Sequence, residues 1–402
     1  MVNRKQRIRN ALWGLFIGDA LAMPAHWYYR VENIQRDFNG GVTGYVDPPH
    51  PHPEAFMVGM AYRPDVEKAH ALDRAFDILH EHARFYNTTY TDRANHRAID
   101  LSEREGAHGN AVAKAEDRYH YHHGLKAGEN TVAAHVARVL IRGCATDGRY
   151  DPDRFLGGFI EHMTTPGRNR DPYNEIYIRR WFENYSRGFP LHACAEEQRN
   201  VWSIGSHGGM IRAMIVSTLF PSAFQGLGFA IEHQQLTHRS ENVAAALGCA
   251  VPLLHTLLAG ADPAAAIAAA IESVPVPKVT GTRLFELYRE HHGPGNIPAD
   301  EMWRLHTELV DEPVEAERLA TACYTEHGFP LMLALARDNN AEFKASLLAS
   351  VNAGGDNVHR TAVLGLLMGA ACEEIPEDLI AGLTAADEIR TEIDAFVALA
   401  PD

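Results

Sequence analysis

Residues 348–371 have the sequence LASVNAGGDNVHRTAVLGLLMGAA. Apolar residues recur at helical spacing before Gly354 and after Asp356, so we expect two helices that meet at the Gly354-Gly355 pair. Asp356 is a good N-cap for the second helix, and the glycines would let a ligand approach the backbone. A simple interhelical turn capped by Asp356 is the commoner explanation of such a pattern. This stretch alone therefore predicts two helices rather than a site.

Helical spacing recurs along most of the chain, whereas strand-like alternation is almost absent. We expect helices over 7–25, 66–86, 130–142, 152–163, 174–187, 207–220, 241–259, 263–272, 315–325, 329–337, 340–351, 357–371 and 387–398. The Gly- and Pro-rich residues 39–64 and the polar, histidine-rich residues 87–127 predict loop insertions. No linker divides the chain, so we expect a single large all-α domain over residues 1–402.

Composition and charge exclude several classes of protein. Hydrophobic residues make up 46% and charged residues 22% of the 402 residues, which is typical of a globular chain. The formal net charge of -15 disfavours nucleic acid and anionic lipid, so we expect a small-molecule substrate and neither a nucleic-acid nor a membrane partner. The five cysteines form no CxxC pair and indicate reduced thiols in the cytoplasm. The oligomeric state stays open.

Four further stretches place polar groups at the ends of expected helices. They are GLFIGDALAMPAHW (14–27), GLKAGENTVAAHVARVL (124–140), IGSHGGMIR (204–212) and LTHRSENVAAALG (236–248). With residues 354–359 they resemble, in the same order, five motifs of the ADP-ribosylglycohydrolase family. The resemblance runs from residue 14 to about residue 383. It implies the all-α fold of that family, with an active cleft where these helix ends converge.

The resemblance also shows where this chain departs from the family. Family members hold two magnesium ions with carboxylates and threonines of a Thr-Asp-Asp-Thr and a Gly-Gly-Asp-Thr-Asp-Thr pattern. The first pattern falls on 128–131, where Glu129 and Asn130 replace the aspartates, and the second falls on 354–359, where Val358 and His359 replace the last Asp-Thr pair. Magnesium needs hard oxygen ligands and a valine ligates nothing, so we expect at least one ion position to be lost.

The replacements remain polar, and they define the candidate site. The glutamate that closes the family's opening motif is replaced by His26. The catalytic candidates are Glu129, Asp356, His26 and His359. The candidate metal ligands are Glu129, Asn130, Asp356 and His359. The candidate substrate-binding residues are Asp19, Asn130, Ser206, His207, Gly354, Gly355 and Asn357.

Two kinds of chemistry suit this set. Imidazoles can act as general acid and base beside carboxylates. Alternatively, two histidines and a carboxylate can bind one divalent ion softer than magnesium, such as manganese, iron or zinc. The resemblance itself implies magnesium, and a site without metal is the remaining alternative. His120, His122 and His123 either border this cleft or form a solvated loop.

The function expected from the resemblance is hydrolysis of an N- or O-glycosidic bond in an ADP-ribosylated, ribosylated or nucleoside-like small molecule. Glu129 or Asp356 would orient or activate water, and His26 or His359 would transfer a proton. One alternative is a catalytically silent binding or structural protein of the same fold. Another is a hydrolase of a different carbon-nitrogen bond, because a fold does not fix a function.

Overall fold

The computed structural model describes residues 3–55, 57–86, 88, 118–196, 205–274 and 321–402. Helices dominate these residues, which confirms the all-α prediction. The α-helices are α1 Arg4–Ala22, α2 Val31–Asp37, α3 Val66–Ala71, α4 Val132–Asp147, α5 Pro152–Thr164, α6 Ile176–Ser186, α7 Gly208–Ser217, α8 Ala223–Gln235, α9 Glu241–Leu258, α10 Pro263–Ser273, α13 Thr325–Asp338, α14 Phe343–Asn352, α15 Asn357–Ala371, α16 Glu377–Ala381 and α17 Ala386–Leu399. Short 3₁₀ turns are η1 Met23–Ala25, η2 Met57–Gly59, η3 His80–Phe85 and η7 Leu191–Ala193.

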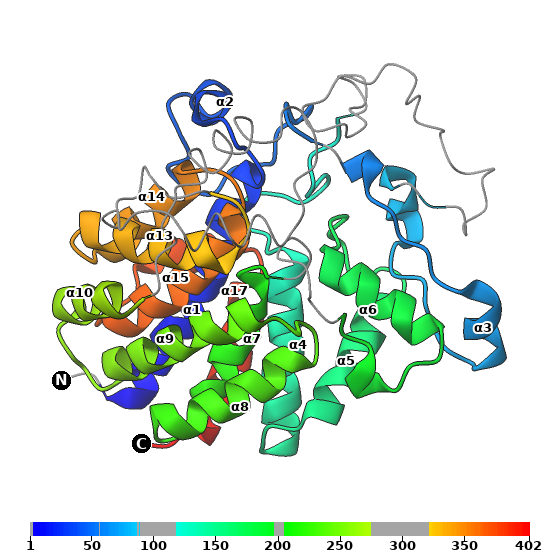
Figure 1. Ribbon diagram of the computed structural model, residues 1–402. Coiled ribbons are helices and arrows are strands. Elements are labelled where there is room, and N and C mark those ends of the chain that lie inside the picture. Colours follow the sequence, from blue (N-terminus) through cyan, green and yellow to red (C-terminus); the bar gives the residue numbers. More distant parts are fainter. Residues whose placement is uncertain (1–2, 56, 87, 89–117, 197–204, 275–320) are drawn as a thin grey trace, which may run out of the picture.

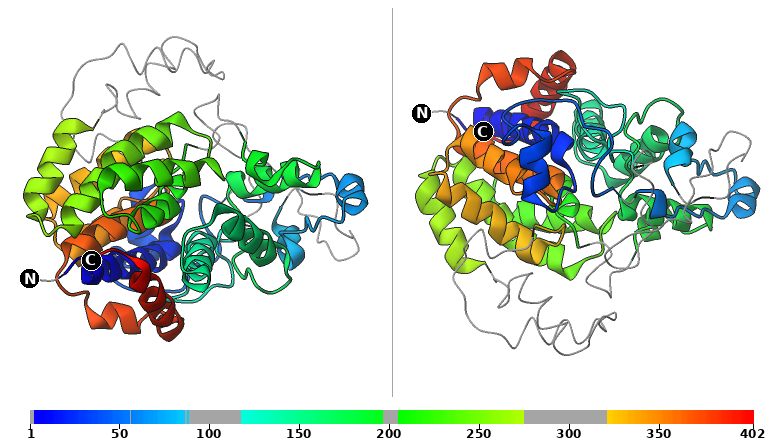
Figure 2. Two further views of the ribbon diagram at one scale, coloured as in Figure 1. Left: turned by 90° about the horizontal axis from the view of Figure 1, so that it is seen from below. Right: turned by 90° about the horizontal axis from the view of Figure 1, so that it is seen from above.

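The buried centre of the molecule is the antiparallel pair α1 and α15 (Figures 1 and 2), with almost every residue of α15 buried. A Cβ built on Gly14 would lie 2.0 Å from the carbonyl oxygen of Gly365, and one on Gly18 would lie 2.3 Å from that of Thr361. The two backbones therefore touch directly, which only residues without side chains allow. This register brings the end of α1 beside the start of α15.

The other helices surround this pair. Helices α7, α9, α13 and α14 pack on α15, and α17 packs on α1 and α4. Both termini lie on one side of the molecule, and α3, α5 and α6 lie on the opposite side (Figures 1 and 2). In the described part of the chain, α9 is the one helix long and apolar enough to span a membrane, and 56% of it is buried in the protein. Core helices pass the same test of length and composition.

Some sequence predictions of helices are wrong. Residues 66–86 do not form one helix, because α3 ends at Ala71 and Asp73 has a positive φ of 51°. Tertiary bonds override the pattern there, since Arg74 donates to the carbonyl groups of Tyr185 and Phe189. The sequence also missed α2, α8 and α16. Of the expected helix 315–325, residues 321–324 are not helical and 315–320 lie outside the described residues.

The two predicted loop insertions differ in outcome. Residues 39–64 contain no regular element apart from η2 among those described, as expected. Of residues 87–127, only 88 and 118–127 are described. His120 and His122 in this segment are buried and take part in the packing, so they are not solvated.

Candidate active site

Asp356 is placed by a backbone clasp at the start of α15. Gly354 and Gly355 adopt φ values of 72° and 68°, which favour glycine. The amide of Gly355 donates to the carbonyl of Tyr28, and its own carbonyl accepts from the amide of Trp27. A Cβ on Gly354 would lie 2.2 Å from the carbonyl oxygen of Tyr28. The clasp therefore fixes Asp356 against the segment that follows α1.

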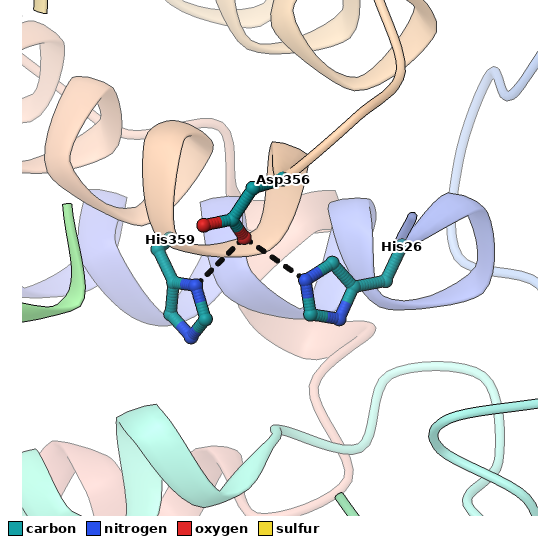
Figure 3. Close-up of side chains that lie close together, drawn as sticks. All are labelled: His26, Asp356 and His359. Carbon is teal, nitrogen blue, oxygen red and sulfur yellow. Dashed lines mark hydrogen bonds and ion pairs between the residues drawn. The ribbon is translucent and has the colours of Figure 1, made fainter. Parts of the chain in front are cut away.

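The Asp356 carboxylate joins two imidazoles (Figure 3). Its Oδ1 lies 2.9 Å from Nε2 of His26 and 2.7 Å from Nδ1 of His359. His26 comes from the turn after α1, whereas His359 lies one helical turn beyond Asp356 on α15. The α1 and α15 contact thus builds this triad from residues 330 positions apart in the chain.

The triad continues outward on both sides. On one side, Nδ1 of His26 lies 2.7 Å from Nε2 of His122, and Nδ1 of His122 lies 2.8 Å from Oδ1 of Asp171. On the other side, Nε2 of His359 lies 3.0 Å from Oε1 of Glu175. We call these six residues the Asp356 cluster: His26, His122, Asp171, Glu175, Asp356 and His359.

Neighbouring groups hold the cluster in place. His120 donates to the carbonyl of Pro24 at 2.9 Å, and His52 donates to the carbonyl of His26 at 2.9 Å. The second carboxylate oxygen of Asp171 accepts from the amide of Val132, at the start of α4. Oε2 of Glu175 accepts from the Ser206 hydroxyl at 3.2 Å. The cluster is therefore part of the packed interior.

The cluster's charges follow from its hydrogen bonds. Three bonds run in a row from Asp171 through His122 and His26 to Asp356, and ionised carboxylates only accept. Two neutral imidazoles supply two N–H groups, so one of the pair must carry a further proton. Burial lowers the pKa of His26 to about 3, with the neighbouring His122 acting in the same direction.

The other two charged groups stabilise each other. Burial raises the pKa of Asp356, but the charge of His359 and the bonds from its histidine neighbours outweigh this and hold the pKa well below its usual range. Burial lowers the pKa of His359, but Asp356 and Glu175 outweigh it and hold that pKa well above its usual range. His359 is thus an imidazolium between two carboxylates.

The cluster is closed to solvent in this conformation. The least buried of its six residues, Glu175, is 5% exposed. A cavity of about 790 Å³ lies elsewhere, lined by residues such as Tyr150, His192 and Arg239, and none of its lining residues belongs to the cluster. Polar groups buried this completely must be satisfied by one another or by a ligand.

The structure separates part of the predicted site from the cluster. Glu129 contacts Arg170, with 2.6 Å between its Oε1 and the Arg170 Nη1, and accepts from the Lys126 amide. Asn130 donates to the carboxylate of Asp19, which also accepts from the amide and hydroxyl of Thr131. Glu129, Asn130 and Asp19 therefore tie the start of α4 to its surroundings, and in this structure none of them contacts Asp356.

The remaining predicted residues lie close to the cluster. Gly354 and Gly355 form the clasp, and Asn357 donates to the carbonyls of Ala25 and Val351. Ser206 contacts Glu175. Nδ1 of His207 lies 3.7 Å from Oδ2 of Asp356.

Sequence reasoning missed Asp171 and Glu175. Both lie in the segment NRDPYNE, residues 169–175, just before α6. This segment has no period and matches none of the five motifs. Two carboxylates four positions apart in a short polar segment are the only signal there, and only the tertiary fold connects them to residues 26 and 359.

Comparison with known proteins identifies the class. The ADP-ribosylglycohydrolase family model matches residues 1–401. The chain therefore belongs to the ADP-ribosylglycohydrolase family, which comprises hydrolases that are typically metal-dependent. Among proteins with curated functions, none matches significantly.

A solved structure supports the same fold. It is described as an "ADP-ribosylglycohydrolase-related protein complex", and it is similar to this chain with a TM-score of 0.50 and 17% sequence identity. The similarity covers 99% of each chain. At this identity the likeness shows the fold and no more.

The residues present do not suit a pair of magnesium ions. In the described part of the chain, the one group of three candidate ligands within reach of a single ion is His26, Asp356 and His359. Their ligand atoms lie within 4.8 Å of one another, and two of the three residues offer nitrogen. Magnesium binds through oxygen in near-octahedral geometry. The family's magnesium chemistry is therefore not supported by this donor set.

Proposed function

We propose that this protein is a hydrolase that cleaves an N- or O-glycosidic bond of an ADP-ribosylated, ribosylated or nucleoside-like small molecule. Family membership supports a glycohydrolase-type activity. The observation that carries the proposal is the Asp356 carboxylate, which lies on the family's Gly-Gly-Asp motif and is bonded to two imidazoles at 2.9 and 2.7 Å. Decay of a site would more naturally leave apolar replacements than a connected set of ionisable groups.

Glu175 is the residue we propose as the general base. Glycosidic hydrolysis needs a carboxylate that activates water and charged groups that stabilise an oxocarbenium-like transition state. The Glu175 carboxylate is held by the Ser206 hydroxyl and by the charge of His359. It is the least buried carboxylate of the cluster, so a substrate or water molecule reaches it first. It takes the role that the sequence suggested for Glu129.

The other members orient these groups. Asp356 fixes His359, and the imidazolium of His359 lies between two carboxylates, so it holds a proton at Nδ1 and one at Nε2. Asp356, His26 and His359 are also the residues that would hold a divalent ion, which when bound would polarise water or a sugar hydroxyl. Burial excludes bulk water from all of these groups, which strengthens every charge interaction among them.

Product release from a panel of substrates tests the proposal. The panel contains N-ribosides, O-ribosides, ADP-ribosylated small molecules and plain amides, and the assay follows the freed sugar, base or amine. We expect turnover of a riboside or an ADP-ribosylated compound that Glu175→Gln reduces by about 10²- to 10⁴-fold, the usual contribution of general acid or base catalysis. Turnover of amides alone would contradict the proposal and favour a hydrolase of another carbon-nitrogen bond.

The closed cluster favours a second candidate, a catalytically silent binding protein of the same fold. Every member of the cluster is at least nine-tenths buried and is hydrogen-bonded or ion-paired with another member. Such a set can be a purely structural polar core. Tight calorimetric binding of ADP-ribose without turnover of any compound in the panel would support this candidate and exclude the enzyme.

A further inference from the structure

His207 is a buried imidazole whose ring nitrogens find no hydrogen-bond partner among the described residues. It is 0% exposed and lies directly before α7. Its Nδ1 lies 3.7 Å from Oδ2 of Asp356, which is too long for a hydrogen bond. Leaving such a group unpaired in the interior costs free energy unless something else binds it. His207 therefore indicates a ligand beside Asp356.

The packing around His207 leaves one nitrogen available for that ligand. A Cβ built on Gly328 of α13 would lie 1.5 Å from Nε2 of His207, so the glycine makes room for this edge of the ring. The opposite edge carries Nδ1, which faces the Asp356 carboxylate. Gly328 thus holds His207 in an orientation that presents Nδ1 toward Asp356.

Two further imidazole nitrogens contact the same carboxylate. Nε2 of His26 and Nδ1 of His359 both contact Oδ1 of Asp356, and the three ligand atoms lie within 4.8 Å of one another (Figure 3). Nδ1 of His207 lies 3.7 Å from Oδ2 of Asp356 but outside this group of three, so it joins the other ligands only after its ring moves toward the ion. The completed set would comprise three imidazole nitrogens and one carboxylate. Zinc, manganese, iron and cobalt accept this combination, whereas magnesium and calcium prefer oxygen.

The second nitrogen of each central histidine has the partner that metal-bound histidines usually have. Nδ1 of His26 contacts His122, which in turn contacts Asp171, and Nε2 of His359 contacts Glu175. Carboxylates behind histidine ligands fix the ring orientation and raise its basicity as a ligand.

We propose that His26, His359, Asp356 and His207 form a mononuclear site for one nitrogen-preferring divalent transition-metal ion of the zinc type, in place of the family's two magnesium ions. The ion would replace the protons that now lie between Asp356 and its two imidazoles, and its binding would release protons. It would also give His207 its missing partner. The proposal concerns the same site as the proposed hydrolase and rests on that function only for the use of the ion in catalysis.

Metal titration of the full-length, untagged protein tests the site directly. The chain is stripped with a chelator and titrated with Zn²⁺ by calorimetry, and with Co²⁺ by visible absorption, which reports nitrogen ligation independently of activity. We expect one ion per chain, no saturable magnesium binding, and a Co²⁺ spectrum typical of several nitrogen ligands. Absence of tight Zn²⁺ and Co²⁺ binding, or two magnesium ions per chain, would overturn the proposal.

Variants separate ligands from the groups behind them. His359→Gln and His207→Gln should each weaken Zn²⁺ binding and change the Co²⁺ spectrum. Glu175→Gln should weaken binding by roughly 10- to 100-fold, the usual effect of a group directly behind a ligand, because Glu175 contacts Nε2 of His359. His192→Gln is the matched control, because His192 also contacts an aspartate, Asp153, but at the surface, so it should bind as the wild type does. Circular dichroism checks that each variant is folded. If a variant does not fold, the Zn²⁺ and Co²⁺ titrations of the wild-type protein decide the proposal.

The two proposals fail in different ways. Riboside turnover by protein that binds no transition metal, and that chelation does not inhibit, would refute the metal site and leave the hydrolase standing. One tightly bound zinc ion without turnover of any substrate would support the metal site and refute the hydrolase.

Discussion

Replacing Gly365 by alanine should both destabilise the protein and disturb the site. The added Cβ would lie 2.0 Å from the carbonyl oxygen of Gly14, whereas ordinary contact begins at 3.4 Å. The obstructing atom belongs to a helix backbone, so relief requires α1 and α15 to separate. Overpacking of this kind costs about 1 to 3 kcal/mol, and the better helix propensity of alanine returns only about 1 kcal/mol. We expect a net loss of about 1 kcal/mol in the free energy of unfolding.

Urea unfolding followed by circular dichroism measures this loss. Gly248→Ala is the matched control, because Gly248 lies within α9 and a Cβ there would meet nothing within 4 Å. That variant should gain about 0.5 to 1 kcal/mol. Equal stability of the two variants would refute the direct backbone contact. Separation of α1 from α15 should also lengthen the contact between His26 and Asp356, so Gly365→Ala should lose activity while Gly248→Ala keeps it.

Three further predictions concern single ionisable side chains. Burial lowers the pKa of His162 to about 3, so the unfolded chain takes up a proton below about pH 6.5 that the folded chain cannot, and stability falls as the pH falls. Between pH 6.5 and 5, the free energy of unfolding of His162→Phe, measured with urea, should therefore fall by about 1 to 2 kcal/mol less than that of the wild type. The same dependence on pH in both proteins would contradict the burial of a neutral histidine. Arg138 is 5% exposed and bonded to Glu392 of α17, so Arg138→Ala should lower the free energy of unfolding by about 3 kcal/mol. Arg142 of the same helix is more exposed, so Arg142→Ala should lower it by under about 1 kcal/mol. Thermal unfolding compares the two variants, and equal losses would argue against a buried ion pair at Arg138. Glu129→Gln should change kcat by no more than about threefold, far less than Glu175→Gln. The reverse order in steady-state kinetics would restore Glu129 as the base.

The amphipathic and glycine patterns allowed most helices to be predicted from the sequence. The stretch around Gly354-Gly355 predicted two helices with Asp356 between them, and α14 and α15 lie on either side of it. The missed helix α8 contains two glycines and exposes Phe224, so its pattern is weak. The segment 66–86 has a helical pattern, but contacts from α6 decide its backbone.

The candidate site could be predicted only where it lies on motifs. His26, Asp356 and His359 lie at motif positions, and the structure brings their side chains together. Glu129 also lies at a motif position, but its side chain contacts Arg170 instead. Asp171 and Glu175 reach the cluster through a loop between α5 and α6, and no local pattern reports which distant imidazoles such a loop will meet.

The most direct test of the account compares Asp356→Asn with wild type in turnover of the best riboside or ADP-ribosylated substrate from the panel. The substitution keeps the size of the side chain and removes the charge that holds His26 and His359. Asp153→Asn is the matched control, because Asp153 contacts a surface histidine. We predict that Asp356→Asn lowers kcat by at least about 10²-fold while Asp153→Asn leaves it unchanged. Equal turnover by all three proteins would contradict the assignment of this cluster as the active site.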